Sequence, residues 1–287
     1  MYAICRASGF LLGLFFISTG LFAQNTADLP TEKSQRDSYL GISLGVILPT
    51  DSLHQHQFLV QANAYALPGS GQNGFDLTGI MPVHRLDLQV GYAAQLSPNW
   101  RLGANIFLSK KDTEDQLSGE LWLSHTSHIR DFLFWEKRVQ FRADNTSREG
   151  SEARGQFLLR TGLGKRWALG DGHGLTSLLS FTAGLDTHES LGDTRTVDRT
   201  EWHLSLLWDR HERFPLALGL WAGRLTEYFF AIETTRYDAN GNLIDFRPDR
   251  KLNIRRFTYG LRLLFRIGGA RAAQPTQLQA MQSLRPR

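Results

Sequence analysis

Apolar and polar residues alternate strictly in the segment 257–267 of this chain. Six apolar side chains, from Phe257 to Ile267, occupy every second position, and small, cationic or single leucine residues fill the positions between them. Successive side chains of a β-strand point to opposite faces, so this segment is predicted to be a strand with one wholly apolar face. The opposite face is predicted to be mostly polar.

The same alternation marks twelve segments of the chain, most regularly 84–96 and 100–109. Polar links containing Gly, Asp and Ser separate them, and 97–99 (Ser-Pro-Asn) is a tight-turn sequence. We therefore predict an all-β, antiparallel, up-and-down β-barrel of about 12 strands, without internal repeats. The predicted strands are 38–48, 57–67, 84–96, 100–109, 117–127, 130–142, 155–168, 175–185, 198–209, 214–223, 226–237 and 254–267.

The number of strands stays open between 12, 14 and 10. Weak additional strands near 74–81 and 242–247 would give fourteen, and 240–241 (Asn-Gly) is a hairpin sequence that favours the second of them. With both barrel ends on one side of a membrane, twelve strands would place the tight turns 97–99, 170–174 and 209–212 on the side where longer loops are usual.

The N-terminus is predicted to be a secretory signal peptide, residues 1–23. Arg6 provides the positive start, 10–22 is an apolar run, and Ala23 is a small residue at a cleavage position; cleavage after Gly20 is the alternative. The chain's single cysteine lies inside this signal, so the mature chain is predicted to contain no disulfide. Removing Arg6 lowers the net charge from +4 to +3, which is too mild to indicate nucleic-acid binding.

The last strand resembles the C-terminal assembly signal of Gram-negative outer-membrane β-barrel proteins. The shared spacing is a polar residue, a glycine, a hydrophobic residue and an aromatic, here Thr258, Gly260, Leu263 and Phe265. The resemblance covers 38–267, and no narrower family matches. It implies a transmembrane barrel in the outer membrane of a Gram-negative bacterium, with outer-membrane lipid and the barrel assembly machinery as partners.

Outside the barrel, the resemblance places 24–37 as a periplasmic lead-in and 268–287 as a flexible periplasmic tail. The tail carries three arginines and no acid. It departs from the family pattern, in which the chain stops near the last aromatic. A disordered end is one interpretation, and a cationic arm that binds a periplasmic partner or enters the lumen is the other.

Three tryptophans lie beside predicted turns: Trp100, Trp167 and Trp208. Amphipathic rings prefer the boundary between membrane and water, so these residues are predicted to form part of an interfacial girdle. The alternative is that they are core aromatics of a soluble β-sandwich.

The inward face is predicted to carry charged residues. Six arginines against three carboxylates leave a positive surplus, which favours a water-filled channel for small polar or anionic solutes over an interior closed by paired charges. Arg166 is the sixth of these arginines, and the other five are among the residues named next. The predicted lumen-lining residues are Arg85, Asp87, Arg101, Glu120, Arg160, Glu201, His203, Arg262 and Arg266.

A lipid hydrolase is a further hypothesis. Outer-membrane phospholipases and lipid A deacylases carry a His-x-Ser pair on one strand, because residues i and i+2 share a face and the imidazole can take the serine proton. His203 with Ser205 and His125 with Ser127 have this spacing. The third group expected about a dozen residues on is absent after the first pair, whereas Glu136 and Gln140 follow the second.

No catalytic, cofactor or metal site is predicted. His54 and His56 lie in a polar link without a carboxylate or cysteine cluster that would complete a site. The leading hypothesis is a porin-like channel. The alternatives are a non-conducting barrel that acts as an assembly or interaction component, and the lipid hydrolase.

Overall fold

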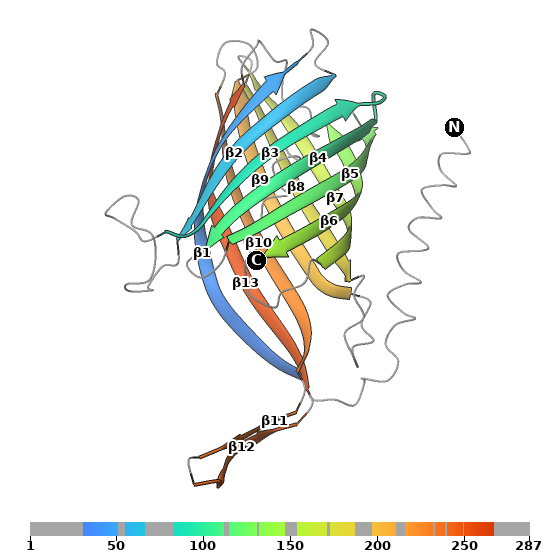
Figure 1. Ribbon diagram of the computed structural model, residues 1–287. Coiled ribbons are helices and arrows are strands. Elements are labelled where there is room, and N and C mark those ends of the chain that lie inside the picture. The colour runs from blue at the N-terminus through green and yellow to red at the C-terminus, as the bar shows by residue number, and fades with distance from the viewer. Residues whose placement is uncertain are drawn as a thin grey trace, which may run out of the picture.

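Eleven strands form a closed barrel in the computed structural model (Figure 1). The structure describes residues 31–50, 55–66, 83–111, 115–130, 132–146, 154–170, 173–186, 197–210, 216–231, 233–238, 240–248 and 250–266. The strands are β1 (Thr31–Pro49), β2 (His56–Ala66), β3 (Val83–Gln95), β4 (Trp100–Lys111), β5 (Asp115–Arg130), β6 (Leu133–Thr146), β7 (Arg154–Gly170), β8 (His173–Asp186), β9 (Val197–Arg210), β10 (Leu216–Ala231), β11 (Thr234–Tyr237), β12 (Leu243–Arg247) and β13 (Arg250–Arg266).

The barrel closes through a parallel pair, β1 with β13, and every other neighbouring pair is antiparallel. An odd number of strands in up-and-down order requires one such parallel seam. The prediction of an all-β up-and-down barrel is confirmed, and the closed sheet excludes the sandwich alternative. The described residues contain no helix long and apolar enough to cross a membrane.

The barrel has eleven strands where about twelve were predicted, because the predicted strands 214–223 and 226–237 are largely one strand, β10. Its pairing with β13 runs without a register shift from Leu216 to Ala231. Arg224, exposed on the outer face, interrupts the apolar alternation in the sequence but not the backbone ladder.

The hairpin expected at 240–241 is present, but it lies outside the barrel wall. β11 and β12 form a separate two-stranded sheet, and Gly241 has the positive φ of 80° that a tight turn requires. The other weak strand, predicted near 74–81, lies outside the described residues.

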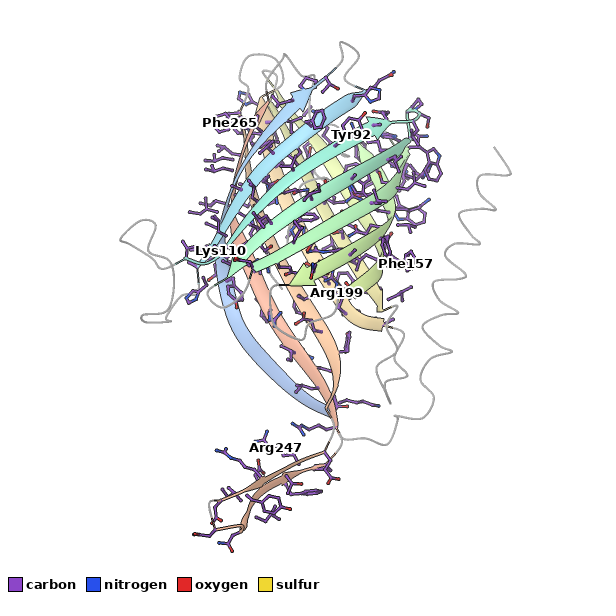
Figure 2. The ribbon with its side chains drawn as sticks, in the orientation of Figure 1. Tyr92, Lys110, Phe157, Arg199, Arg247 and Phe265 are labelled. Atoms are coloured by element: carbon purple, nitrogen blue, oxygen red, sulfur yellow. The ribbon has the colours of Figure 1, made fainter. Side chains whose placement is uncertain are left out.

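Buried and exposed side chains alternate along the strands as a barrel requires. In β3 the exposed Leu86 and Leu88 alternate with the buried Arg85, Asp87 and Gln89. The outer face is apolar and the inner face is mostly polar. Figure 2 shows the outward side chains projecting around the wall.

Large inward side chains pack over glycines of neighbouring strands. Gly103 pairs with Trp122 and Gly164 pairs with Phe134, and a Cβ atom at either glycine would collide with the aromatic ring. Glycine thus makes room for rings inside the wall. This cross-strand packing helps to occupy an interior wider than that of an eight-stranded barrel.

The two ends of the barrel differ. The short connections 96–99, 131–132 and 171–172 share one end with the last residue of β13, and we call it the short-turn end. The opposite end carries the longer connections, including 67–82 and 187–196. With eleven strands, β1 begins at the end with the longer connections and β13 ends at the short-turn end, so the first and last residues of the barrel wall lie at opposite ends.

At this opposite end, β1, β10 and β13 extend beyond the other strands (Figure 1). We call residues 31–39, 228–231 and 250–258, together with the β11–β12 hairpin, the projection. β1 begins at Thr31, so residues 31–37 of the expected lead-in 24–37 belong to this strand. They are paired in part with β13. Arg256 joins Glu227 of β10 by an ion pair of 2.7 Å.

Candidate functional site

Eight of the nine residues predicted to line the lumen have buried side chains: Arg85, Asp87, Arg101, Glu120, Arg160, Glu201, His203 and Arg262. They lie on the inward positions of β3, β4, β5, β7, β9 and β13. Arg266 ends β13, and its side chain lies outside those described. Arg166 is half-buried near the short-turn end of β7.

Six further buried charges were missed by the sequence analysis: Glu136, Arg138, Arg142, Asp144, Arg199 and Asp209. All six lie on inward positions of β6 or β9. Even-numbered positions from 136 to 144 alternate along β6, and 199 to 209 alternate along β9 with Glu201. Applying the period of two to these less regular strands would have found them.

These additional groups almost remove the expected surplus of positive charge. Among the described buried side chains there are seven arginines and six carboxylates. The argument for an anion-selective channel rested on twice as many arginines as acids, and that ratio is absent from the interior of the barrel.

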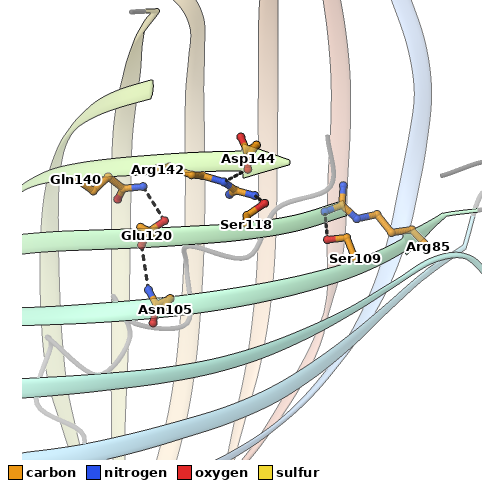
Figure 3. A network of polar contacts seen from close by, with 8 residues as sticks. All are labelled: Arg85, Asn105, Ser109, Ser118, Glu120, Gln140, Arg142 and Asp144. Atoms are coloured by element: carbon orange, nitrogen blue, oxygen red, sulfur yellow. Dashed lines mark hydrogen bonds and ion pairs between the residues drawn. The ribbon is translucent and has the colours of Figure 1, made fainter. Parts of the chain in front are cut away.

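Glu120 is the centre of one interior network (Figure 3). One of its carboxylate oxygens accepts a hydrogen bond from Asn105 Nδ2 on β4 at 2.9 Å, and the other accepts from Gln140 Nε2 on β6 at 3.0 Å. Charge-assisted hydrogen bonds of this kind hold a buried carboxylate in place. The network thereby joins three neighbouring strands.

Two arginines of the interior bridge an acid on their own strand and a serine on the next. Arg142 Nε donates to Asp144 at 2.8 Å and its Nη2 donates to Ser118 Oγ at 3.2 Å (Figure 3). Arg85 repeats this arrangement with Asp87 at 2.5 Å and Ser109 at 3.1 Å. In both cases the serine lies on the adjacent strand and accepts the second bond. Arginine and acid at i and i+2 share the inward face, so the chain supplies its own counter-charge.

Aromatic rings also cover interior cations. The Arg138 guanidinium lies 4.2 Å from the centroid of the Trp122 ring, and that of Arg142 lies 4.9 Å from the Phe107 ring. Such cation–π contacts are stronger where water is excluded. Apolar residues also enter the interior near the short-turn end, where Ile47, Leu59, Leu207, Ala217 and Leu264 form a buried cluster.

The predicted girdle tryptophans lie at one end of the barrel. Trp100 begins β4, while Trp167 and Trp208 lie near the ends of β7 and β9, so all three are at the short-turn end. Trp208 stacks on His173 with ring centroids 5.2 Å apart, and Trp100 lies 4.6 Å from the His125 ring.

A second set of aromatic residues lies on the outer face toward the opposite end. Phe141 packs on its register partner Phe157 with ring centroids 5.1 Å apart. Phe181 packs on its partner Trp202 at 4.9 Å. Aromatic side chains therefore flank the apolar outer surface on both sides along β6 to β9.

The two His-x-Ser pairs lie on different faces. His125 Nδ1 and Ser127 Oγ are 3.3 Å apart toward the outer face, but the expected third group, Glu136, is buried on the inward face with Gln140. His203 is buried inside the barrel, and its ring stacks on Trp221 at 6.2 Å. Within the described residues neither pair is accompanied by an acid or amide in the geometry of a catalytic triad.

The four residues that resemble the assembly signal are divided between the two faces of β13. Thr258 and Gly260 are buried inward, Leu263 is half-buried on the outer face and Phe265 is exposed. Among the described residues no cluster of three or more histidine, cysteine or acidic side chains could hold a metal ion. His54, residues 1–23 and the tail 268–287 lie outside the described residues.

No family model, no curated protein and no solved structure matches this chain.

Proposed function

We propose that this protein is an outer-membrane barrel that does not conduct solutes and acts through its projection as an interaction component. The observation that carries the proposal is the burial of the charged inward side chains. A water-filled pore would leave such groups hydrated, because charges facing an aqueous lumen gain from contact with water. In this barrel they are buried among other inward side chains, and Arg85 with Asp87 and Arg142 with Asp144 form ion pairs.

The outer face supports placement in a membrane. Leucine, isoleucine, valine and phenylalanine side chains are exposed around the wall, far more apolar surface than a water-soluble monomer usually exposes. Phe157 and Trp167 lie ten residues apart on β7. At about 3.3 Å per residue and a tilt of about 40°, this spacing gives an apolar band about 25 Å tall, the height typical of outer-membrane barrels.

The lengths of the connections support one orientation. Periplasmic turns of such barrels are short and extracellular loops are longer. The short-turn end then faces the periplasm, where β13 ends, and the projection faces the outside of the cell. The interaction surface we propose is therefore extracellular.

Two features of the projection suit the binding of a partner protein. No described strand pairs with the outer edge of residues 31–39 of β1, so that edge offers backbone donors and acceptors to an added strand. The β11–β12 hairpin exposes four large apolar side chains, Tyr237, Leu243, Ile244 and Phe246. A lone two-stranded hairpin is marginally stable in water, and an apolar contact with a partner would stabilise it.

Planar-bilayer recording of the refolded mature protein under a salt gradient tests the non-conducting barrel. The expected result is a sealed bilayer containing folded, heat-modifiable protein. Stable conductance steps with an anion-biased reversal potential would overturn the proposal and restore the porin-like channel.

Site-specific photo-crosslinking on intact cells tests the interaction surface. A photo-reactive amino acid at Leu243, on the hairpin, is expected to give a discrete cross-linked protein. The matched control is Lys110, which is exposed at the same end of the barrel but outside the projection. Equal cross-linking from both positions, or none from Leu243, contradicts this role for the hairpin.

A further inference from the structure

Arg101 is a buried cation without a counter-charge. Its side chain enters the barrel from β4 and is 2 % exposed, and its Nε has no hydrogen-bond partner. Among the described residues no carboxylate forms an ion pair with it. Glu120, on the neighbouring strand, is already bonded to Asn105 and Gln140. Burying a guanidinium without a counter-charge costs free energy, and a bound anion would lower that cost.

Trp122 supplies a second unpaired donor beside it. Its indole Nε1–H is buried and has no hydrogen-bond partner, although a buried tryptophan usually finds one. Gly103 accommodates the ring on one strand and Arg138 stacks on it from another, so the position of the indole is fixed. The indole N–H is thus fixed inside the barrel and is available to donate a hydrogen bond to a bound ligand.

Arg101 and Trp122 line the same cavity. Asn105, Gln57, Leu59 and Ile47 contribute to its walls. The cavity volume is about 20 Å³, enough for a particle about the size of one water molecule. Carboxylates, phosphate and sulfate carry several oxygens and are too large, whereas a single-atom anion fits.

The charge of Arg101, buried without an ion pair, favours an anion over a water molecule in this cavity. Seven buried arginines face six buried carboxylates among the described residues, which leaves one positive charge in excess. Water would satisfy donors but would not neutralise that charge. A monatomic anion does both.

We propose that the cavity between Arg101 and Trp122 binds a halide ion, chloride in the cell. The guanidinium supplies the charge and the indole N–H a directed hydrogen bond. The apolar side chains of Ile47 and Leu59 exclude competing water. This site is separate from the proposed interaction role. The proposal of a halide site does not depend on whether the barrel conducts solutes.

Bromide provides a direct probe, because it scatters anomalously and resembles chloride in charge and shape. Crystals of the full mature protein soaked in sodium bromide are expected to show an anomalous peak between Arg101 and Trp122. No peak in this cavity, with ordered water there instead, overturns the proposal. This result needs no variant and so does not depend on the folding of a mutant.

Thermal unfolding in detergent provides the second measurement. At matched ionic strength, chloride is expected to raise the unfolding midpoint of the wild-type protein by several degrees relative to gluconate, because a ligand that binds only the folded state stabilises it. Arg101→Gln is expected to abolish the difference and Trp122→Phe to reduce it.

The matched control is Lys137→Gln, which removes a cation from the outer side of β6 and is expected to keep the full chloride effect. Equal midpoints in chloride and gluconate for the wild-type protein contradict the site. An equal loss of the chloride effect in Lys137→Gln would show a general ionic effect and would likewise contradict it.

Discussion

Trp221 of β10 packs against Gly41 of β1 across the intervening strand β13. A Cβ atom at Gly41 would lie 2.6 Å from Cζ2 of this indole, and Gly260, the register partner of Gly41, lies beneath the same ring. The parallel seam therefore depends on two opposed glycines and one tryptophan that covers both.

Substitution of Gly260 is expected to weaken this seam. In Gly260→Ala the new methyl group would meet the backbone carbonyl of Gly41 as well as Trp221, and a backbone atom cannot turn aside as a side chain can. We expect a loss of at least about 1–3 kcal/mol in the free energy of unfolding, the usual cost of overpacking. Urea titration in lipid vesicles, followed by heat-modifiable gel mobility, measures it.

The control for this variant is Gly119→Ala on β5, where a Cβ atom would meet nothing within 4 Å. Its urea midpoint is expected to match the wild type. Equal midpoints for both variants would show that the seam tolerates a side chain at Gly260.

Glu120→Gln is expected to destabilise the barrel by about 2–3 kcal/mol, because one of the donors, Asn105 or Gln140, would lose its acceptor in a buried site. Asp245→Asn is the exposed counterpart, since the ion pair of Asp245 with Arg247 lies on the hairpin surface. That change is expected to cost less than about 1 kcal/mol. Comparable urea midpoints for the two variants would argue against a structural role for the interior network.

Placement in a membrane predicts an unusual response to charge at Leu121. This side chain is 61 % exposed on the outer face of β5. In a water-soluble barrel Leu121→Arg would be nearly neutral, whereas an arginine at the middle of a bilayer costs about 2–4 kcal/mol. Folding into lipid vesicles is therefore expected to be impaired.

The hairpin residue Leu243, 58 % exposed, gives the matched substitution. Leu243→Arg is expected to leave the folding of the barrel into vesicles unchanged. A wild-type yield for Leu121→Arg would place that face in water and contradict the membrane proposal.

Removal of the hairpin is expected to leave the barrel intact. Ala231 and Arg250 are register partners, so an Asn-Gly turn can replace residues 232–249 and continue the β10–β13 ladder. β11 and β12 pair only with each other. The shortened protein is expected to keep the wild-type urea midpoint; a large decrease would mean that the hairpin supports the wall.

The turn of the hairpin is expected to respond to acid through Asp238. Its carboxylate accepts hydrogen bonds from Asn242 Nδ2 at 3.0 Å, from the Asn242 backbone N–H at 2.8 Å and from the Asn240 backbone N–H at 2.8 Å. These bonds favour the charged form and hold the pKa of Asp238 below its ordinary value of 3.8.

Because the folded pKa is lowered, the stabilisation of the turn is complete above the ordinary value and is lost as the pH falls through the lowered pKa. The amide chemical shifts of Asn240 and Asn242 are expected to titrate in that acidic range in the wild type and to stay flat in Asp238→Asn. Flat shifts in both proteins would show that the carboxylate does not hold the turn.

The sequence was informative wherever one face of a strand was uniformly apolar. Arg85, Asp87 and Glu120 follow from simple alternation, and their burial agrees with it. Alternation could not reveal that β10 continues past Arg224. The charged side chain breaks the apolar pattern of the outer face, whereas the backbone pairing of β10 with β13 continues to Ala231. Pairing partners are also invisible to it, so the contacts of Glu120 with Asn105 on β4 and Gln140 on β6 could not be predicted.

The parallel seam also has a consequence for folding. Thr31 pairs with Lys251, so the first and last barrel strands meet only when some 220 residues of chain lie between their partners. Contacts between such distant segments form slowly, because closing a long loop costs conformational entropy before the contacts between its ends have formed. Until then the chain carries two long unpaired strand edges that could capture a second chain. A second copy that paired with either edge would therefore compete with closure of the barrel until the last strand is in place.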